Sequence, residues 1–101
     1  MAKRVVWTKT AKKSRREILE YWIEHNGSKS YSIKLSDLFR RKIELLASQE
    51  YIGKPTDFKD VRATLVSHFS IFYKTNRSEI IIVGIWDNRR NPDDLQTNLQ
   101  L

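Results

Sequence analysis

The sequence predicts an α+β fold in which a small, twisted, mostly antiparallel sheet packs against an N-terminal helical hairpin. Two segments with apolar residues at helical spacing lie in the first half of the chain, joined by a short Gly-Ser connection. Three runs rich in β-branched and aromatic residues fill most of residues 61–86, and a fourth, shorter run lies near the N-terminus. The predicted order is β-α-α-β-β-β, in one domain that spans residues 1–101.

The first predicted strand is "RVVWT", Arg4–Thr8, which is short, β-branched and aromatic. Thr8 or Thr10 is able to cap a helix that runs to about Asn26, where Gly27 supplies the stop. On this helix a basic stripe lies opposite the apolar face, at spacings i, i+3, i+4 and i+7. The stripe consists of Lys9, Lys12, Lys13 and Arg16. A solvated surface and a binding face for a polyanion explain it about equally well.

The second helix follows the "NGSKS" connection and is predicted to end at about Ser48. It carries a broad apolar arc, flanked by Ile43. The arc consists of Tyr31, Leu35, Leu38, Phe39, Leu45 and Leu46. Two long helices joined by so short a loop form an antiparallel hairpin. Each has enough apolar surface to need a partner layer.

The second half of the chain is predicted to be mostly strand. Glu50–Asp60 is expected to be irregular, because Gly53 and Pro55 interrupt it. Strands are predicted at Val61–Val66, His68–Lys74 and Glu79–Trp86, the last two joined as a hairpin by a polar turn. Beyond them, the aspartates that follow Pro92 indicate the start of a helix rather than a metal site.

Charge is the first unusual property of the chain, because 19 basic residues against 12 acidic ones give a net charge of +7. The excess is uneven: residues 1–50 hold 12 Lys or Arg against 6 Asp or Glu, whereas residues 51–101 hold 7 against 6. This asymmetry indicates a polyanionic partner, either nucleic acid or an acidic protein segment.

The composition also limits the chemistry. The chain has no Cys, which excludes disulfides and thiolate catalysis, and its two His are far apart in sequence, which disfavours a zinc site. No apolar run is long enough to cross a membrane, and no signal-peptide core is present, so a cytoplasmic protein without metal or cofactor is expected. His68 is interpreted as a turn residue, because no acid or nucleophile accompanies it.

The residues left for chemistry or binding are mostly basic and lie around the predicted strands. They are Lys54, Lys59, Arg62, Arg89 and Arg90, with Tyr73. Adjacent strands of a small sheet could bring them onto a common surface suited to phosphate, because guanidinium offers forked donors. The plainer alternative makes Arg62 a sheet-surface residue and treats Arg89 and Arg90 as a polar loop that prevents edge association.

Several pieces of the chain, taken in order, resemble the RelE/ParE superfamily of toxins. "VVWTKTAKKSRREILEYWIEHN" is similar to the opening strand and basic first helix of that family. "GKP", "VRATLVSHFSIFYK" and "IIIVGIWDNRRNP" are similar to its three-strand end. The resemblance covers about residues 4–95 and is nearest to toxins of the plasmid-stabilisation type. The ordered series of pieces carries it, since no single motif is strong.

The resemblance implies the toxin half of a type II toxin–antitoxin pair, a growth inhibitor. Its partner would be a small acidic antitoxin, in a hetero-oligomer. The positive charge and the apolar helix faces suit such a partner through electrostatic steering and helix burial. For contacts to the target or the antitoxin the candidates are Lys9, Lys12, Lys13, Arg16, Arg62, Arg89 and Arg90.

Two activities occur in the superfamily. ParE-type members poison DNA gyrase without chemistry of their own, whereas RelE-type members cut mRNA on the ribosome with Arg, Lys and sometimes Tyr side chains. RelE has an arginine directly after an aromatic residue early in the third strand, where this chain has Ser70 after Phe69. The RelE arginine beyond the last strand has counterparts in Arg89 or Arg90, but no aromatic residue follows them here.

The resemblance therefore favours a gyrase poison and leaves open whether the chain is an enzyme. The alternative is a ribosome-dependent mRNA endonuclease that uses Arg62, Arg89 or Arg90 and a lysine such as Lys54. Tyr73, eleven residues after Arg62, fits both branches. A third interpretation is a nucleic-acid-binding module without toxicity.

Overall fold

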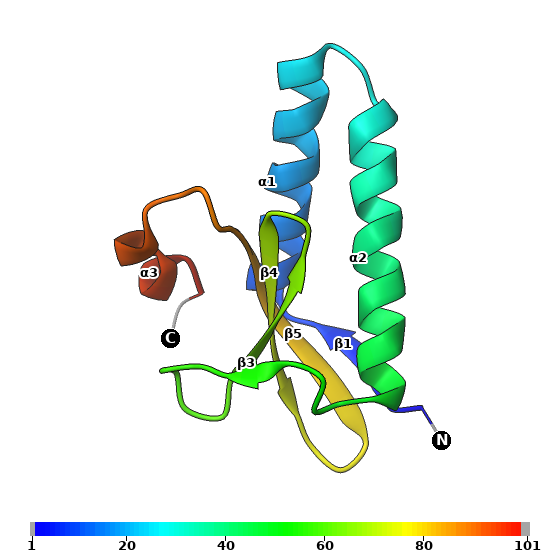
Figure 1. The fold of residues 1–101 in the computed structure, drawn as a ribbon, viewed down its shortest axis with the longest axis vertical. Helices are drawn as coiled ribbons and strands as arrows, with labels where there is room; N and C mark the ends of the chain where they lie inside the picture. Colours follow the sequence, from blue (N-terminus) through cyan, green and yellow to red (C-terminus); the bar gives the residue numbers. More distant parts are fainter. Residues whose placement is uncertain (1, 100–101) are drawn as a thin grey trace.

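The computed structural model describes residues 2–99, and its elements follow the predicted order with three additions (Figure 1). The elements are β1 (Arg4–Trp7), α1 (Lys9–Asn26), α2 (Ser30–Ser48), β2 (Lys54–Pro55), β3 (Arg62–Val66), β4 (Phe69–Thr75), β5 (Glu79–Asp87), the 3-10 turn η1 (Pro92–Asp94) and α3 (Leu95–Leu99). The predicted α+β fold is confirmed, including the helical start after Pro92. The two-residue strand β2 lies inside the stretch that was expected to be irregular.

The five strands form one sheet in the order β1-β5-β4-β3-β2. β1 pairs with β5 in parallel, because the α1–α2 hairpin returns the chain to the far side of the sheet before the meander begins. All other pairs are antiparallel, with a register shift between Phe72 and Tyr73 where β4 meets β5. β5 is therefore the strand between β1 and β4, which explains its apolar run from Ile80.

The helical hairpin has the ends that the sequence predicts. Thr8 caps α1, since its side-chain oxygen accepts a hydrogen bond of 3.1 Å from the backbone N–H of Ala11. Gly27 ends α1 in the left-handed conformation at φ 65°. The antiparallel pair stands against the sheet in Figure 1, with α3 set apart from α2.

Apolar side chains gather on both faces of the sheet. The face toward the hairpin holds the larger core, in which Leu35, Phe39 and Leu46 of α2 meet the inward residues of β3, β4 and β5. Ile43 belongs to this core, whereas Leu45, predicted as part of the arc, is only half-buried. The opposite face holds a smaller core around Phe72, Trp86 and Leu99. Leu99 brings α3 against the sheet.

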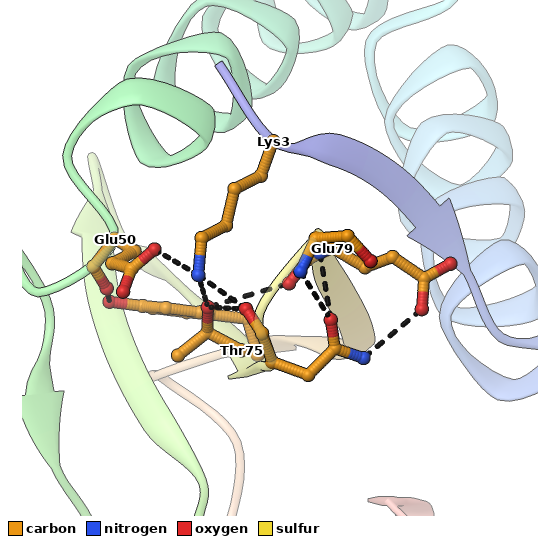
Figure 2. Close-up of polar contacts among 7 residues, drawn as sticks. Lys3, Glu50, Thr75 and Glu79 are labelled. Atoms are coloured by element: carbon orange, nitrogen blue, oxygen red, sulfur yellow. Dashed lines mark hydrogen bonds and ion pairs between the residues drawn. The ribbon is translucent and has the colours of Figure 1, made fainter. Parts of the chain in front are cut away.

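A polar network ties the N-terminal strand to the rest of the sheet (Figure 2). The Nζ atom of Lys3 forms an ion pair with Glu50 and donates a hydrogen bond of 3.1 Å to the hydroxyl of Thr75. Arg4 pairs with Glu79 in the neighbouring strand. The hydrogen bonds from Lys3 and Arg4 hold the pKa values of Glu50 and Glu79 below their ordinary range.

Within residues 2–99, none of the helices combines the length and the apolar character that a membrane span requires.

Candidate functional site

A groove of about 560 Å³ lies between α1, the end of β5 and the C-terminal segment. We call it the Arg89 groove. Ile18, Trp22 and Ile85 give it an apolar lining, and Glu17, Asp87, Arg89 and Arg90 supply its charged groups. Concave sites with an apolar lining and a few fixed polar groups are typical of binding sites.

The loop after β5 owes its shape to the side chains of Asp87 and Asn91. The carboxylate of Asp87 accepts a hydrogen bond of 2.9 Å from the backbone N–H of Arg89. The backbone carbonyl of Asp87 accepts a hydrogen bond of 3.0 Å from the backbone N–H of Arg90, and this bond closes a turn. Asn91 then caps η1 by accepting from the N–H of Asp93, with Pro92 in the first helical position. The sequence Asp-Asn-Arg-Arg-Asn-Pro thus encodes a turn followed by a helix start.

Arg89 is held in place by a carboxylate and by two aromatic rings. Its Nε and Nη2 atoms donate to the two carboxylate oxygens of Asp87, at 2.9 and 2.8 Å. The guanidinium lies 5.0 Å from the ring centre of Trp22 and 5.7 Å from that of Phe69. The hydrogen bond to Asp87 raises the pKa of Arg89. Arg89 therefore joins the end of β5 to α1.

Burial alone would raise the pKa of Asp87, but its surroundings act more strongly in the other direction. Hydrogen bonds from Arg89, together with the charges of Arg89 and His68, hold that pKa below its ordinary value. The carboxylate is therefore ionised at neutral pH and is already occupied by Arg89.

Arg90 differs from Arg89 in its contacts. Its guanidinium lies 4.5 Å from the ring centre of Trp86, and its side chain is exposed. Within the part of the chain that the structure describes, no carboxylate forms an ion pair with it. Arg90 thus supplies a positive charge at the groove that is available to an external anion.

Aromatic side chains of the hairpin support this site. The ring of Trp22 contacts those of His25 and Tyr31 edge-on, at centroid distances of 5.2 and 5.0 Å. Tyr21 stacks on His25 and stays 53% exposed at the rim of the groove. A half-exposed aromatic residue beside a cation is typical of interaction surfaces.

The basic stripe of α1 lies on the solvent side of the helix, as predicted. All four of its residues, Lys9, Lys12, Lys13 and Arg16, are exposed. Among residues 2–99, the one ion pair of the stripe is a long contact of 3.9 Å from Lys13 to Glu17. Exposed pairs of this kind contribute little to stability, so the stripe is available to a partner.

The structure divides the remaining predicted residues instead of bringing them to one surface. Arg62 lies opposite Tyr73, whereas Asp87, beside the two arginines, lies opposite Phe69 at the other end of β4. The distance along β5 from Ile82, the partner of Tyr73, to Asp87 is roughly 16 Å at 3.3 Å per residue. The expected common surface is therefore not formed, because the hairpin register separates its members.

The group around Arg62 is mainly structural. Arg62 donates a hydrogen bond of 2.8 Å to the carbonyl of Gly53, and its guanidinium lies 4.9 Å from the ring centre of Tyr51. Tyr73 is fully buried, and burial raises its pKa. Its hydroxyl accepts from the N–H of Gly53 at 3.0 Å and donates to the carbonyl of Glu50 at 2.8 Å. Both of its hydrogen bonds thus go to the loop that precedes β2.

Two cations of this predicted set stay on the surface. Lys54 is exposed on β2, opposite Ala63, and Lys59 is exposed in the loop between β2 and β3. The sequence analysis named neither Trp22 nor Asp87 as a contact of Arg89. An aspartate two residues before an arginine, directly after a strand, was the available signal.

The Asp87–Arg89 pair makes folding stability depend on pH. The pKa of Asp87 is lower in the folded chain than in the unfolded one. The pair therefore stabilises the fold fully at pH values above the ordinary aspartate pKa of about 4. This stabilisation is lost as the pH falls through the lowered pKa of the folded chain. Asp87→Asn should cost about 1 kcal/mol at pH 7, a small figure because the Arg89 side chain is 44% exposed. Urea unfolding at several pH values would measure this.

The two stability curves should converge at acid pH, once the wild-type carboxylate is protonated. Asp57→Asn removes an exposed loop carboxylate outside the Arg89 groove and serves as the control variant. A constant difference between wild type and Asp87→Asn at all pH values would contradict the assignment.

Comparison with known proteins agrees with this architecture. The family model for the ParE toxin of the type II toxin–antitoxin system parDE matches residues 5–92. Among solved structures, the fold is similar to that of a chain described as the chromosomal ParDE TA system from P. aeruginosa, with a TM-score of 0.72 and 19% sequence identity. The alignment covers 83% of this chain and 94% of that one. No curated protein matches the sequence.

The hairpin, the meander sheet and the basic loop after β5 together define a small α+β protein of the RelE/ParE superfamily. Within that superfamily, the match over residues 5–92 places the chain in the family of ParE toxins of type II toxin–antitoxin systems.

Proposed function

We propose that this chain arrests growth in the cytoplasm by binding DNA gyrase, and that an acidic antitoxin neutralises it. The Arg89 groove carries the proposal. Its apolar lining and the exposed guanidinium of Arg90 suit a protein surface with an acidic residue beside an apolar one. Membership of the ParE family supports gyrase as the target.

The separation of the basic residues supports binding rather than RNA cleavage. A nuclease that uses arginine, lysine and tyrosine must bring them around one phosphate. Here Arg62 lies at the other end of β4 from Arg89, and the hydroxyl of Tyr73 is buried and hydrogen-bonded to backbone. The guanidinium of Arg89 is itself hydrogen-bonded to the carboxylate of Asp87.

The antitoxin is proposed on the ground of charge. The net charge of +7 and the exposed stripe would attract an acidic chain to the first half of α1. The stripe lies on the solvent side of α1, so such a chain could contact it without disturbing the core.

Controlled expression of the chain in a bacterial host tests the proposed function. Growth should stop, gyrase–DNA cleavage complexes should accumulate, and transcripts should remain intact. Co-expression of the acidic protein encoded by an adjacent reading frame should restore growth. Codon-phased cuts in mRNA would replace the proposal with the ribonuclease alternative, and cells that divide freely would exclude both activities.

A further inference from the structure

The solvent side of α1 carries two blocks of opposite charge. Its first half holds the basic stripe, and its second half holds three exposed glutamates, Glu17, Glu20 and Glu24. At 3.6 residues per turn, these seven side chains fall within an arc of about 140° around the helix axis. The arc lies opposite Ala11, which is fully buried against the sheet. We call the seven residues the bipolar face.

The stability of α1 itself does not account for this order of charges. A helix dipole favours acidic residues in the first turn and basic ones in the last, whereas the first turn of α1 has lysines and no acidic residue. Among residues 2–99, the one ion pair within the bipolar face joins Lys13 to Glu17 at 3.9 Å, with the cation first, which is the less favourable order. Glu20 and Glu24 have no cationic partner among the same residues.

The spacing of the two blocks makes the face complementary to itself. If a two-fold axis passes between residues 16 and 17, an antiparallel second copy of α1 places residue 33 − i beside residue i, because 16 + 17 = 33. Three pairs of opposite charge then face one another, each of them twice: Lys9 with Glu24, Lys13 with Glu20, and Arg16 with Glu17. This register brings no like charges of the face opposite each other.

The remaining cation of the face also finds a partner in this register. Lys12 falls opposite Tyr21 of the second copy, whose ring is 53% exposed and can accept a cation. From Lys9 to Glu24 the contact would extend over about 22 Å at 1.5 Å per residue. Packed helices lie about 8–10 Å apart, a separation that lysine and glutamate side chains span.

From these observations we infer that two copies of this chain associate through the bipolar faces of their α1 helices, antiparallel and with two-fold symmetry. An acidic protein segment or a nucleic acid fits this face less well, because either would complement the basic half and be repelled by the three glutamates. The face contributes four positive and three negative charges, so +6 of the net charge of +7 lies elsewhere. Repulsion between those charges is screened over about 8 Å at physiological salt.

Sedimentation equilibrium of the full chain in 0.15 M salt, at concentrations up to 1 mM, tests the inference. The wild type should form a reversible dimer. Lys13→Glu should weaken the dimer about tenfold or more, because two attractive pairs become repulsive, and Glu20→Lys should do the same. An equimolar mixture of the two variants should dimerise about as well as wild type, since each copy then supplies the charge that is reversed in the other. A folding defect cannot be restored in this way.

Two control variants make the same charge changes in the exposed loop between β2 and β3. Lys59→Glu and Asp57→Lys should each change the dissociation constant less than about twofold. The inference is wrong if the wild type stays monomeric at 1 mM, if the mixture does not dimerise, or if the loop variants weaken the dimer as much as the helix variants do. A dimer that neither Lys13→Glu nor Glu20→Lys weakens would also contradict it, because another surface would then form the contact.

The inference goes beyond the proposed function. A second copy and the proposed acidic antitoxin would compete for the basic half of the face, because both need the same four cations. The assay contains only this chain, so its failure leaves the gyrase and antitoxin proposals untouched.

Discussion

Gly53→Ala should lower the free energy of unfolding by about 2–4 kcal/mol, although it adds only one methyl group. A β-carbon at this position would lie 2.5 Å from the hydroxyl of Tyr73 and 2.8 Å from the carbonyl oxygen of Ala63. The backbone of Gly53 is held from two sides, by Tyr73 at its N–H and by Arg62 at its C=O. Relief of the clash therefore has to break at least one buried hydrogen bond.

Urea unfolding followed by tryptophan fluorescence would measure the loss, with Gly84→Ala as the control. A β-carbon at Gly84 would lie 2.2 Å from the end of the Leu99 side chain, which can move with α3, and at an ordinary contact distance of 3.9 Å from the hydroxyl of Ser14. The control should cost about 1 kcal/mol. A Gly53→Ala protein as stable as wild type would show that the loop before β2 is not packed against Tyr73.

Tyr73→Phe isolates the contribution of the hydroxyl. The loss should be about 1–3 kcal/mol, because the N–H of Gly53 and the C=O of Glu50 lose their partner. Combined with Gly53→Ala it should cost less than the sum of the two single changes, since both act on one contact. Such coupling would mark Tyr73 as a structural residue.

Much of the fold follows from local signals in the sequence. A glycine after the helical pattern placed the end of α1 at the observed residue, Gly27, whereas the sequence left its cap open between Thr8 and Thr10 and the structure shows Thr8. Runs rich in β-branched and aromatic residues located the three later strands. The strand order could not be predicted, because parallel pairing of β1 with β5 depends on how the hairpin packs and leaves no local pattern. β2 was missed, since two residues that include Pro55 give no strand signal.

The candidate site was harder to predict than the fold. The two arginines after β5 were identified from sequence, but their neighbours were not, because the register of β4 against β5 decides which residues meet. Tyr73 was grouped with the arginines as a possible catalytic residue, and the register buries it instead. The distinction between Arg89 and Arg90 depends on a single side chain, Asp87, which reaches one guanidinium and not the other.

That distinction leads to the largest functional effect that we expect. Arg90→Ala should leave the free energy of unfolding within about 1 kcal/mol of wild type, because among residues 2–99 its exposed guanidinium contacts only the ring of Trp86. On the proposed function, the same change should weaken binding to gyrase roughly 30-fold, the effect of losing one central charged contact. Growth arrest on induction and affinity for purified gyrase would measure this.

Two matched variants separate binding from folding. Arg77→Ala removes an exposed arginine from the turn between β4 and β5, remote from the groove, and should stay fully toxic. Arg89→Ala should lose stability as well as toxicity, because it leaves Asp87 without its partner and removes the contact with Trp22. If Arg90→Ala arrests growth as strongly as wild type, the free guanidinium is not the target contact. The Arg89 groove would then act through its apolar lining alone, and Tyr21, which is half-exposed at the rim, would become the residue to replace.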